Sequence, residues 1–204
     1  MRRLVVALII LVTSSSCAEE ISIEQRVRSC DWTLLSDQKA LLYRDKDNHN
    51  ILMMASEVGC FSLVASLVDK IDINERTRIG TTALFSAVES ADSRIVRLLI
   101  QKNIDVNATE FLNGEEALIV AVMMGNIKIT RILLESGANP NRTETKLNST
   151  SLHMAVSAKR YSLVKLLLEY GADSTIKAKR LGTPLDIAKR KKDERMIKLL
   201  TSKS

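Results

Sequence analysis

The chain has 204 residues, with 30 lysines and arginines against 24 acidic residues, for a formal net charge of +6. Only two prolines are present, and aromatic residues make up 3% of the sequence. This composition predicts a single all-helical domain of ordinary size. No glycine-rich phosphate loop occurs, which excludes a nucleotide-binding enzyme of the P-loop type.

Residues 1–17 predict an export signal. Arg2 and Arg3 precede an unbroken apolar run, residues 4–12, and small residues then lead to Cys17. Nine apolar residues are too few to span a bilayer as a permanent helix. A positive start, a short apolar run and small residues are typical of a signal peptide. A buried first helix would fit the arginine pair and the serine run badly, so we expect the chain to be exported.

Two ways of removing this signal fit the residues around Cys17. The stretch SSSC resembles the lipobox of bacterial lipoproteins, in which the cysteine is lipid-modified and becomes the new N-terminus. Ser14 departs from that motif, which usually has leucine there. The alternative is ordinary cleavage after Ala18, with Ser16 and Ala18 as the small residues. We favour the lipoprotein, and Ala18 beside the cysteine then implies an outer-membrane anchor.

Residues 18–46 are helical in pattern but lack the periodicity of the rest of the chain. Their apolar stripe consists of Val27, Trp32, Leu34, Leu35, Leu41 and Leu42. We predict a capping helix that covers the first of the repeats described next, because end units of repeat arrays are atypical. A polar tether from the membrane is the alternative for the first ten residues.

Residues 47–204 repeat one pattern about every 33 residues. Aligned on one alanine, the copies fall at Ala55, Ala87, Ala121, Ala155 and Ala188, in steps of 32, 34, 34 and 33. A leucine stands three residues before each alanine, as Leu152 does before Ala155. A second apolar helical segment follows, and Gly171 then stands where a left-handed residue stops a helix. Every copy is therefore predicted to be helix, short turn and helix.

The copies NILMMA, TALFSA, EALIVA, TSLHMA and TPLDIA resemble the ankyrin repeat, whose signature is T-P-L-H-x-A. The resemblance implies an all-α solenoid of about five helix-turn-helix repeats with an N-terminal capping helix. The repeats would span about 47–76, 77–109, 110–143, 144–177 and 178–204. The resemblance also implies that the chain binds another protein through a concave face, which hairpin tips and first helices form.

Two apolar groups stand out at the positions that the resemblance assigns to this concave face. Phe111 and Leu112 lie at a tip that is one residue longer than the family pattern, and Met123 and Met124 take places that are normally polar. Because methionine adapts its shape to a partner, we predict an apolar binding centre in the third repeat. The alternative for Met123 is packing against its neighbours. The cationic candidates on this face are Arg78, Lys146, Lys179, Arg180 and Lys191.

Charge is distributed unevenly along the chain. Residues 18–107 carry 11 basic and 14 acidic side chains, whereas residues 176–204 carry 10 basic and 3 acidic ones. A solvated capping helix explains the basic end. The alternative is a patch for an acidic protein or for an anionic membrane or envelope surface. Nucleic acid does not fit an exported chain.

No constellation of residues predicts catalysis, a cofactor or a metal site. His153 fills the last place of the T-P-L-H motif, where the resemblance implies a structural bond between neighbouring hairpins. His49 has no cysteine or carboxylate partner at metal-ligand spacing. Ser151 and His153 are too close in sequence to predict a catalytic triad.

Cys30 and Cys60 are the cysteines that are left once Cys17 is lipidated or removed. Cys60 precedes the second helix of the first repeat and faces the region that the cap should cover. In an oxidising compartment the two would bridge if their Cα atoms lie within about 4.4–6.8 Å. The alternative is a pair of small buried hydrophobic side chains.

The predicted function is a non-catalytic protein-binding scaffold of a bacterial envelope, an adaptor or protective partner similar to periplasmic ankyrin proteins linked to oxidative-stress defence. Asn107 and Asn141 begin N-x-T triplets where ankyrin repeats close, and glycans there would crowd the hairpins. This favours a bacterial protein. The alternative function is an immunity protein that neutralises a toxin delivered to the periplasm.

Overall fold

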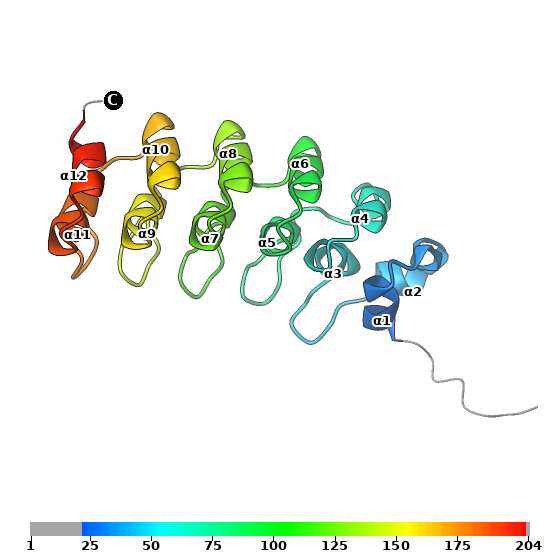
Figure 1. Ribbon diagram of the computed structural model, residues 1–204. Helices are drawn as coiled ribbons and strands as arrows, with labels where there is room; N and C mark the ends of the chain where they lie inside the picture. The colour runs from blue at the N-terminus through cyan, green and yellow to red at the C-terminus, as the bar shows by residue number, and fades with distance from the viewer. Residues whose placement is uncertain (1–21, 203–204) are drawn as a thin grey trace, which may run out of the picture.

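The computed structural model describes residues 22–202. The export signal, its cleavage site and Cys17 lie outside these residues. Within them, antiparallel pairs of helices stack side by side in two rows, and a loop projects from the same side of each pair (Figure 1). None of the helices in this part of the chain is long and apolar enough to cross a membrane.

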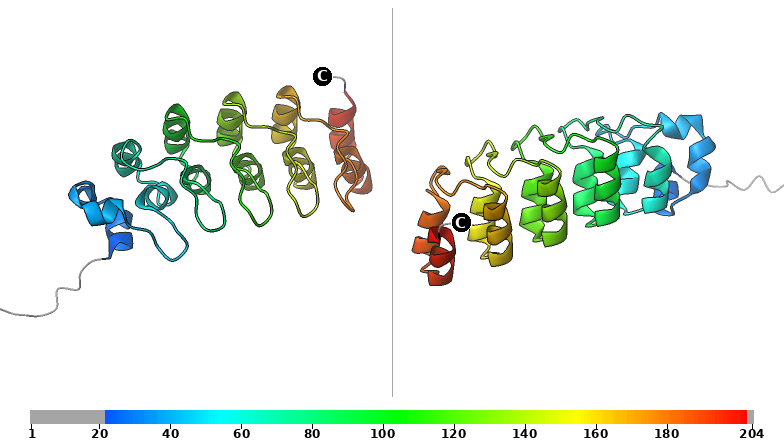
Figure 2. Two further views of the ribbon diagram at one scale, coloured as in Figure 1. Left: turned by 180° about the vertical axis from the view of Figure 1, so that it is seen from behind. Right: turned by 90° about the horizontal axis from the view of Figure 1, so that it is seen from above.

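The two rows contain the first and second helices of the repeats. The inner row consists of α3 (Ile51–Glu57), α5 (Ala83–Glu89), α7 (Ala117–Met124), α9 (Ser151–Ser157) and α11 (Pro184–Arg190). The outer row consists of α4 (Phe61–Leu67), α6 (Ser93–Gln101), α8 (Ile127–Glu135), α10 (Tyr161–Glu169) and α12 (Glu194–Thr201). Each inner helix packs on its outer partner and on the next inner helix (Figure 2). The all-helical solenoid predicted from the sequence is confirmed.

The recurring leucine and alanine of the inner helices form the continuous core. Leu152 and Ala155 have no exposed surface, and the same holds for Leu118 and Ala121. The small alanine lets neighbouring helices approach, and the leucine fills the space between repeats. Leu185, the equivalent residue in α11, is only half-buried, because within residues 22–202 no further inner helix packs against α11.

Local sequence explains where the helices begin and end. The Asn50 side chain accepts a hydrogen bond from the backbone N–H of Met53 at 2.9 Å at the start of α3. Thr183 and Asp186 form a reciprocal capping box at the start of α11. Gly171, after α10, has φ +80, so the predicted left-handed stop is confirmed.

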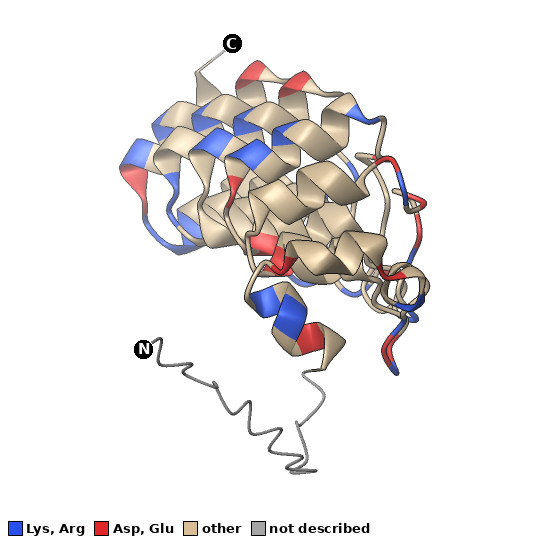
Figure 3. Ribbon diagram, turned by 90° about the vertical axis from the view of Figure 1, so that its right-hand side faces the viewer, with Lys and Arg blue, Asp and Glu red and all other residues tan. Residues whose placement is uncertain are grey.

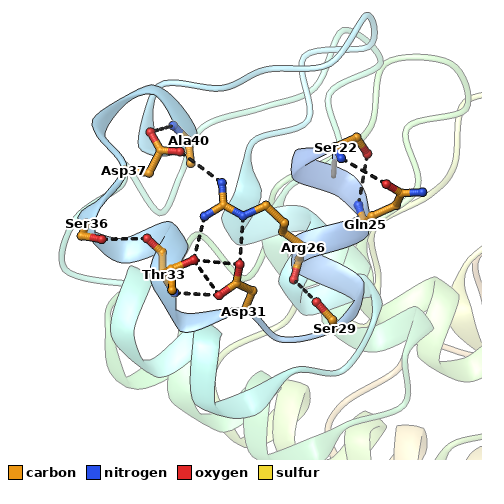
Figure 4. A network of polar contacts seen from close by, with 9 residues as sticks. All are labelled: Ser22, Gln25, Arg26, Ser29, Asp31, Thr33, Ser36, Asp37 and Ala40. Atoms are coloured by element: carbon orange, nitrogen blue, oxygen red, sulfur yellow. Dashed lines mark hydrogen bonds and ion pairs between the residues drawn. The ribbon is translucent and has the colours of Figure 1, made fainter. Parts of the chain in front are cut away.

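The N-terminal segment is not the single capping helix that its pattern predicts. It forms α1 (Ile23–Arg28), a 3-10 helix η1 (Trp32–Ser36) and α2 (Gln38–Leu41). Asp31 and Asp37 interrupt the helical run, because each side chain caps the N-terminus of the helix that follows it. The Arg26 guanidinium binds both carboxylates, at 2.9 and 3.2 Å, and so holds the three short helices together (Figure 4).

This segment nevertheless covers the end of the array. Helix α1 packs on α3, and η1 contacts α4. Val27 and Leu34 are buried as the apolar stripe predicts, whereas Trp32 and Leu42 are exposed, so the prediction was wrong for these two. The tether alternative is also wrong from Ser22 onward, because Ser22 caps α1.

A disulfide joins Cys30 to Cys60. Their Cα atoms are 5.9 Å apart, inside the range that a bridge requires. Cys60 immediately precedes α4, so the bond ties the N-terminal cap to the outer helix of the first complete repeat.

Candidate protein-binding surface

The hairpin tips are the loops that precede the inner helices and project from the inner row. Backbone hydrogen bonds join each tip to the next. The N–H of Arg78 donates to the carbonyl oxygen of Asp47 at 2.9 Å. Equivalent bonds of 2.6 Å run from Phe111 to Ile79, from Thr145 to Asn113 and from Lys179 to Leu147. The tips therefore form a continuous ladder, which orders this side of the molecule before any partner arrives.

Two of the tips are one residue longer than the others, and a buried glutamate holds each of them. The carboxylates of Glu110 and Glu144 each accept hydrogen bonds from three backbone N–H groups of their own tip. Burial acts to raise the pKa of Glu144, but hydrogen bonds from Ser149 and the rest of the tip lower it below its usual range. The ionised side chain thus fixes the longer loop.

In the first tip, the Asp45 carboxylate fixes the loop in the same way. It accepts hydrogen bonds from the backbone N–H groups of Asp47 and His49, both at 2.8 Å, and lies 3.0 Å from His49 Nδ1. The prediction that His49 lacks a carboxylate partner was wrong, because the tight loop brings residues four apart together. The ligand atoms of Asp45, Asp47 and His49 lie within 4.8 Å of one another. Because Asp45 holds the tip as Glu110 and Glu144 do, we assign this cluster a structural role.

The structural role predicted for His153 is confirmed. Its Nδ1 accepts a hydrogen bond from the backbone N–H of Thr150 at 3.1 Å, and its Nε2 lies 3.1 Å from the carbonyl oxygen of Gly182 in the next repeat. Burial lowers the pKa of His153. The neutral ring can accept at Nδ1 and donate at Nε2, which matches both contacts.

Ile79, Phe111 and Leu112 form one exposed apolar group, which we call the tip cluster. The Phe111 ring lies over Gly80 of the preceding tip, where an added Cβ would come within 2.9 Å of the ring. The Arg76 guanidinium lies 5.8 Å from the centre of the same ring. Phe111 is still 64% exposed and Leu112 is 68% exposed, so both are available to a partner.

Met123 and Met124 belong to a second group, which we call the methionine groove. It is lined by Glu89, Glu115, Val120, Met123 and Met124 and has a volume of about 500 Å³. Met123 is 51% exposed, so it is not packed away against its neighbours. Glu115 and Val120 are outside the positions that the repeat pattern assigns to the concave face, although Val120 stands one helical turn before Met124 and so shares its face.

Carboxylates flank the apolar floor of the methionine groove. Burial and the nearby Glu57 carboxylate raise the pKa of Glu89. Burial and the charges of Glu110 and Glu144 raise the pKa of Glu115. Both carboxylates therefore ionise against desolvation and against repulsion by neighbouring carboxylates, and an incoming cation would relieve both effects.

Phe111 and Leu112 of the tip cluster precede α7, whereas Met123 and Met124 of the methionine groove stand at the C-terminal end of this helix. The helix has eight residues, which at 1.5 Å per residue separates its ends by about 12 Å. The sequence predicted one apolar centre made of Phe111, Leu112, Met123 and Met124. The structure has two, because the tip folds Phe111 back onto Gly80.

The five cationic candidates do not form one site. Four of them are exposed on three different tips: Arg78 on one, Lys146 on another, and Lys179 and Arg180 together on the last. Lys191 follows α11, and its Nζ donates to the carbonyl oxygen of Ser157 at 3.0 Å. It thereby satisfies the C-terminus of α9, which is a structural role between neighbouring repeats.

Glu116 is a buried carboxylate below this surface, at the N-cap of α7, where three other copies have threonine. Burial raises its pKa to about 7, although the ion pair with Arg142 opposes the shift. Folding therefore favours the protonated acid over the carboxylate.

Glu116→Thr is expected to remove a pH dependence of stability. The folded pKa lies above the ordinary value of 4.5, so the contribution of Glu116 is fully present below about pH 4.5 and is lost as the pH rises through about 7. The variant should exceed the wild-type free energy of unfolding at pH 8 by about 1–3 kcal/mol. Denaturant titrations at pH 5 and pH 8 measure this, with exposed Glu135→Gln as the control. Parallel pH profiles for wild type and Glu116→Thr would contradict it.

Comparisons with known proteins agree with this architecture. Residues 23–110 and 108–178 match the family model of ankyrin repeats in three copies. The chain belongs to the ankyrin repeat family, whose members generally serve as scaffolds for protein–protein interaction. The match begins at residue 23 and so includes the N-terminal cap.

One similar solved structure is the crystal structure of the ankyrin repeat domain of Bcl-3, which is described as a unique member of the IkappaB protein family. The similarity has a TM-score of 0.76 at 27% sequence identity and covers 87% of this chain and 80% of that one. No match is found among curated proteins.

Proposed function

We propose that this chain is a non-catalytic scaffold of a bacterial envelope that holds a partner protein against its concave face, as an adaptor or protective partner. The observation that carries the proposal is the location of the exposed apolar side chains. The tip cluster and the methionine groove both lie on the side of the tips and inner helices. On the outer row, Ile127 is the one large hydrophobic side chain among the described residues that is strongly exposed.

The methionine groove favours a particular partner chemistry. Its floor of Val120, Met123 and Met124 would take an apolar side chain. Glu89 and Glu115 would pair with a lysine or arginine beside it, since both are crowded by other carboxylates. We therefore expect a partner segment that places a cationic residue next to an apolar one.

Replacing Phe111 and Met124 together with serine is expected to abolish capture of the partner from the envelope at low and at high salt, because apolar contacts at the centre of an interface supply most of its affinity. Cross-linking followed by identification of the captured protein measures this. The single variants show whether the tip cluster or the methionine groove matters more.

The matched control reverses the charge of Lys189 and Lys192, two exposed residues of the basic end, to glutamate. It should slow association at low salt and have little effect at high salt, because exposed charges mainly steer encounter. If the control abolishes capture and the serine variant does not, the basic end is the binding site. The identity of the partner also tests the immunity alternative, which requires a toxin delivered to the same compartment.

The disulfide supports the exported part of the proposal. The bond between Cys30 and Cys60 would persist in an oxidising compartment such as the bacterial periplasm and would be reduced in the cytosol. We propose in addition that Cys17 carries a lipid that anchors the chain to the outer membrane.

Labelled palmitate is expected to enter the wild-type protein and to be absent from Cys17→Ser, since the lipid requires that thiol. Fluorography of the purified protein measures the label. Replacing both Cys30 and Cys60 with serine should leave the labelling unchanged. A mature protein that begins at Glu19 and carries no lipid would rule out the anchor.

A further inference from the structure

Basic side chains recur in register on the exposed face of the outer row. In α6, α8 and α12, lysine or arginine occupies two positions three residues apart, and α10 has one at the second position. These residues, which we call the basic stripe, are Arg94, Arg97, Lys128, Arg131, Lys165, Arg195 and Lys198. All seven are exposed. Figure 3 shows lysine and arginine segments side by side on neighbouring helices of one face.

Helix geometry makes the stripe a continuous surface. Residues three apart, such as Arg94 and Arg97, point to the same side, while Ile95 and Leu99 of the same helix are buried in the core. Neighbouring helices pack about 8–10 Å apart, so four of them carry the stripe over about 25–30 Å. The outer row lies on the opposite side of the array from the hairpin tips (Figure 1).

Few acidic groups neutralise this surface. The four helices contain seven basic residues and three glutamates, and each glutamate stands at a helix end. Arg94 pairs with Asp92 at 2.7 Å, and Lys165 approaches Glu169 at 3.8 Å. Within residues 22–202, the other five members of the stripe form no ion pair.

The C-terminal end of the stripe also has a groove of about 370 Å³ between α10 and α12. Lys165, Arg195 and Lys198 line it together with Tyr161, Ser162, Leu199 and Ser202. The groove therefore brings three basic side chains of the stripe, from two neighbouring helices, around one space.

The surroundings favour a lipid surface over other anions. Protein interfaces usually have an apolar centre, whereas Ile127 is the strongly exposed large hydrophobic residue of these helices. Single-stranded nucleic acid requires open aromatic rings for stacking, but the Arg195 guanidinium covers the Tyr161 ring at 4.4 Å. A bilayer requires neither an apolar centre nor stacking, because its phosphates attract cations at any register.

We propose that the basic stripe docks the chain on a bilayer containing acidic phospholipids, with the concave face turned away from the membrane. The attraction arises from the negative surface potential and decays within a Debye length, so it weakens as salt rises. It does not depend on the lipid at Cys17. A membrane-docked chain would present the tip cluster and the methionine groove to a partner at the same time.

Vesicle co-sedimentation tests this proposal. The chain, carrying Cys17→Ser so that no lipid is attached, is mixed with phosphatidylcholine vesicles that contain phosphatidylglycerol or lack it. Binding should require phosphatidylglycerol and fall with salt. Combining Arg97→Glu, Arg131→Glu and Lys198→Glu should weaken it by at least about 100-fold, since each basic residue near an anionic surface contributes about a factor of five and the three factors multiply.

The matched control makes the same charge change at the tips, with Lys146→Glu, Lys179→Glu and Arg180→Glu. It should bind vesicles as the parent chain does. Equal losses in the two triple variants, equal binding to vesicles without phosphatidylglycerol, or tighter binding to DNA or to an acidic protein would each overturn the proposal. If the stripe variant loses its helical circular dichroism, vesicle binding is measured instead with a variant that has glutamine at the same three positions, and loss of binding in that folded variant supports the proposal. A stripe variant that still captures the partner separates this proposal from the function of the concave face.

Discussion

Leu152→Ala is expected to lower the free energy of unfolding by about 2–5 kcal/mol. Leu152 has no exposed surface, and its helix α9 packs against α7, α10 and α11. In a solenoid, stability is a sum of repeat and neighbour terms. A cavity at this position therefore weakens the contacts of the fourth repeat with the repeats on both sides. Because the described array has five repeats, these two interfaces are a large part of its total stability.

Urea denaturation followed by circular dichroism measures this loss. The matched control is Leu112→Ala, the same substitution at a tip residue that is 68% exposed. Surface changes of this kind usually stay within about 0.5 kcal/mol. Similar losses in the two variants would mean that burial between repeats does not set the stability of the array.

Replacing both Cys30 and Cys60 with alanine is expected to cost about 2–5 kcal/mol, concentrated at the N-terminal end. The bond closes a loop with a sequence separation of 30 residues and restrains the unfolded chain as well as the cap. Because each repeat contacts only its neighbours, release of the cap should increase amide hydrogen exchange in α1, α3 and α4 and leave α9 almost unchanged.

Reductant is expected to reproduce this effect in the wild type and to have none in the double alanine variant. Non-reducing gels and thiol titration provide a second measurement. The oxidised chain should migrate faster than the reduced one and should titrate no thiol from Cys30 or Cys60. Equal mobility with and without reductant, with both thiols free after unfolding, would show that the bridge is absent from the native protein.

Patterns that repeat along the chain predicted the architecture and much of the core. A period near 33 residues, with Leu152 and Ala155 on one helical face, is sufficient to predict stacked helix pairs, because i, i+3 and i+4 spacing decides which side of a helix is apolar. The same spacing places Val120 beside Met124. Gly171 and His153 could also be interpreted from sequence, since each acts on backbone groups at a constant offset within the repeat.

The arrangement of the candidate sites depended on local turns and on contacts between repeats, neither of which the apolar periodicity reports. Asp31 and Asp37 broke the predicted capping helix because their side chains bind nearby backbone N–H groups. A tight loop paired Asp45 with His49, and the ladder of tips folded Phe111 onto Gly80, so that one expected apolar centre became two.

For the basic stripe too, one part could be predicted from the sequence and another part is decided by the packing of the repeats. The sequence segments SRIVR, IKITR and ERMIK contain its cations, and their spacing places each pair on one side of its own helix. That these helices lie next to one another, with their cations on a common outer face, follows from the packing of the inner leucines and alanines. Periodicity reports the faces of single helices, whereas the distance between residues of different repeats is set by how those faces pack.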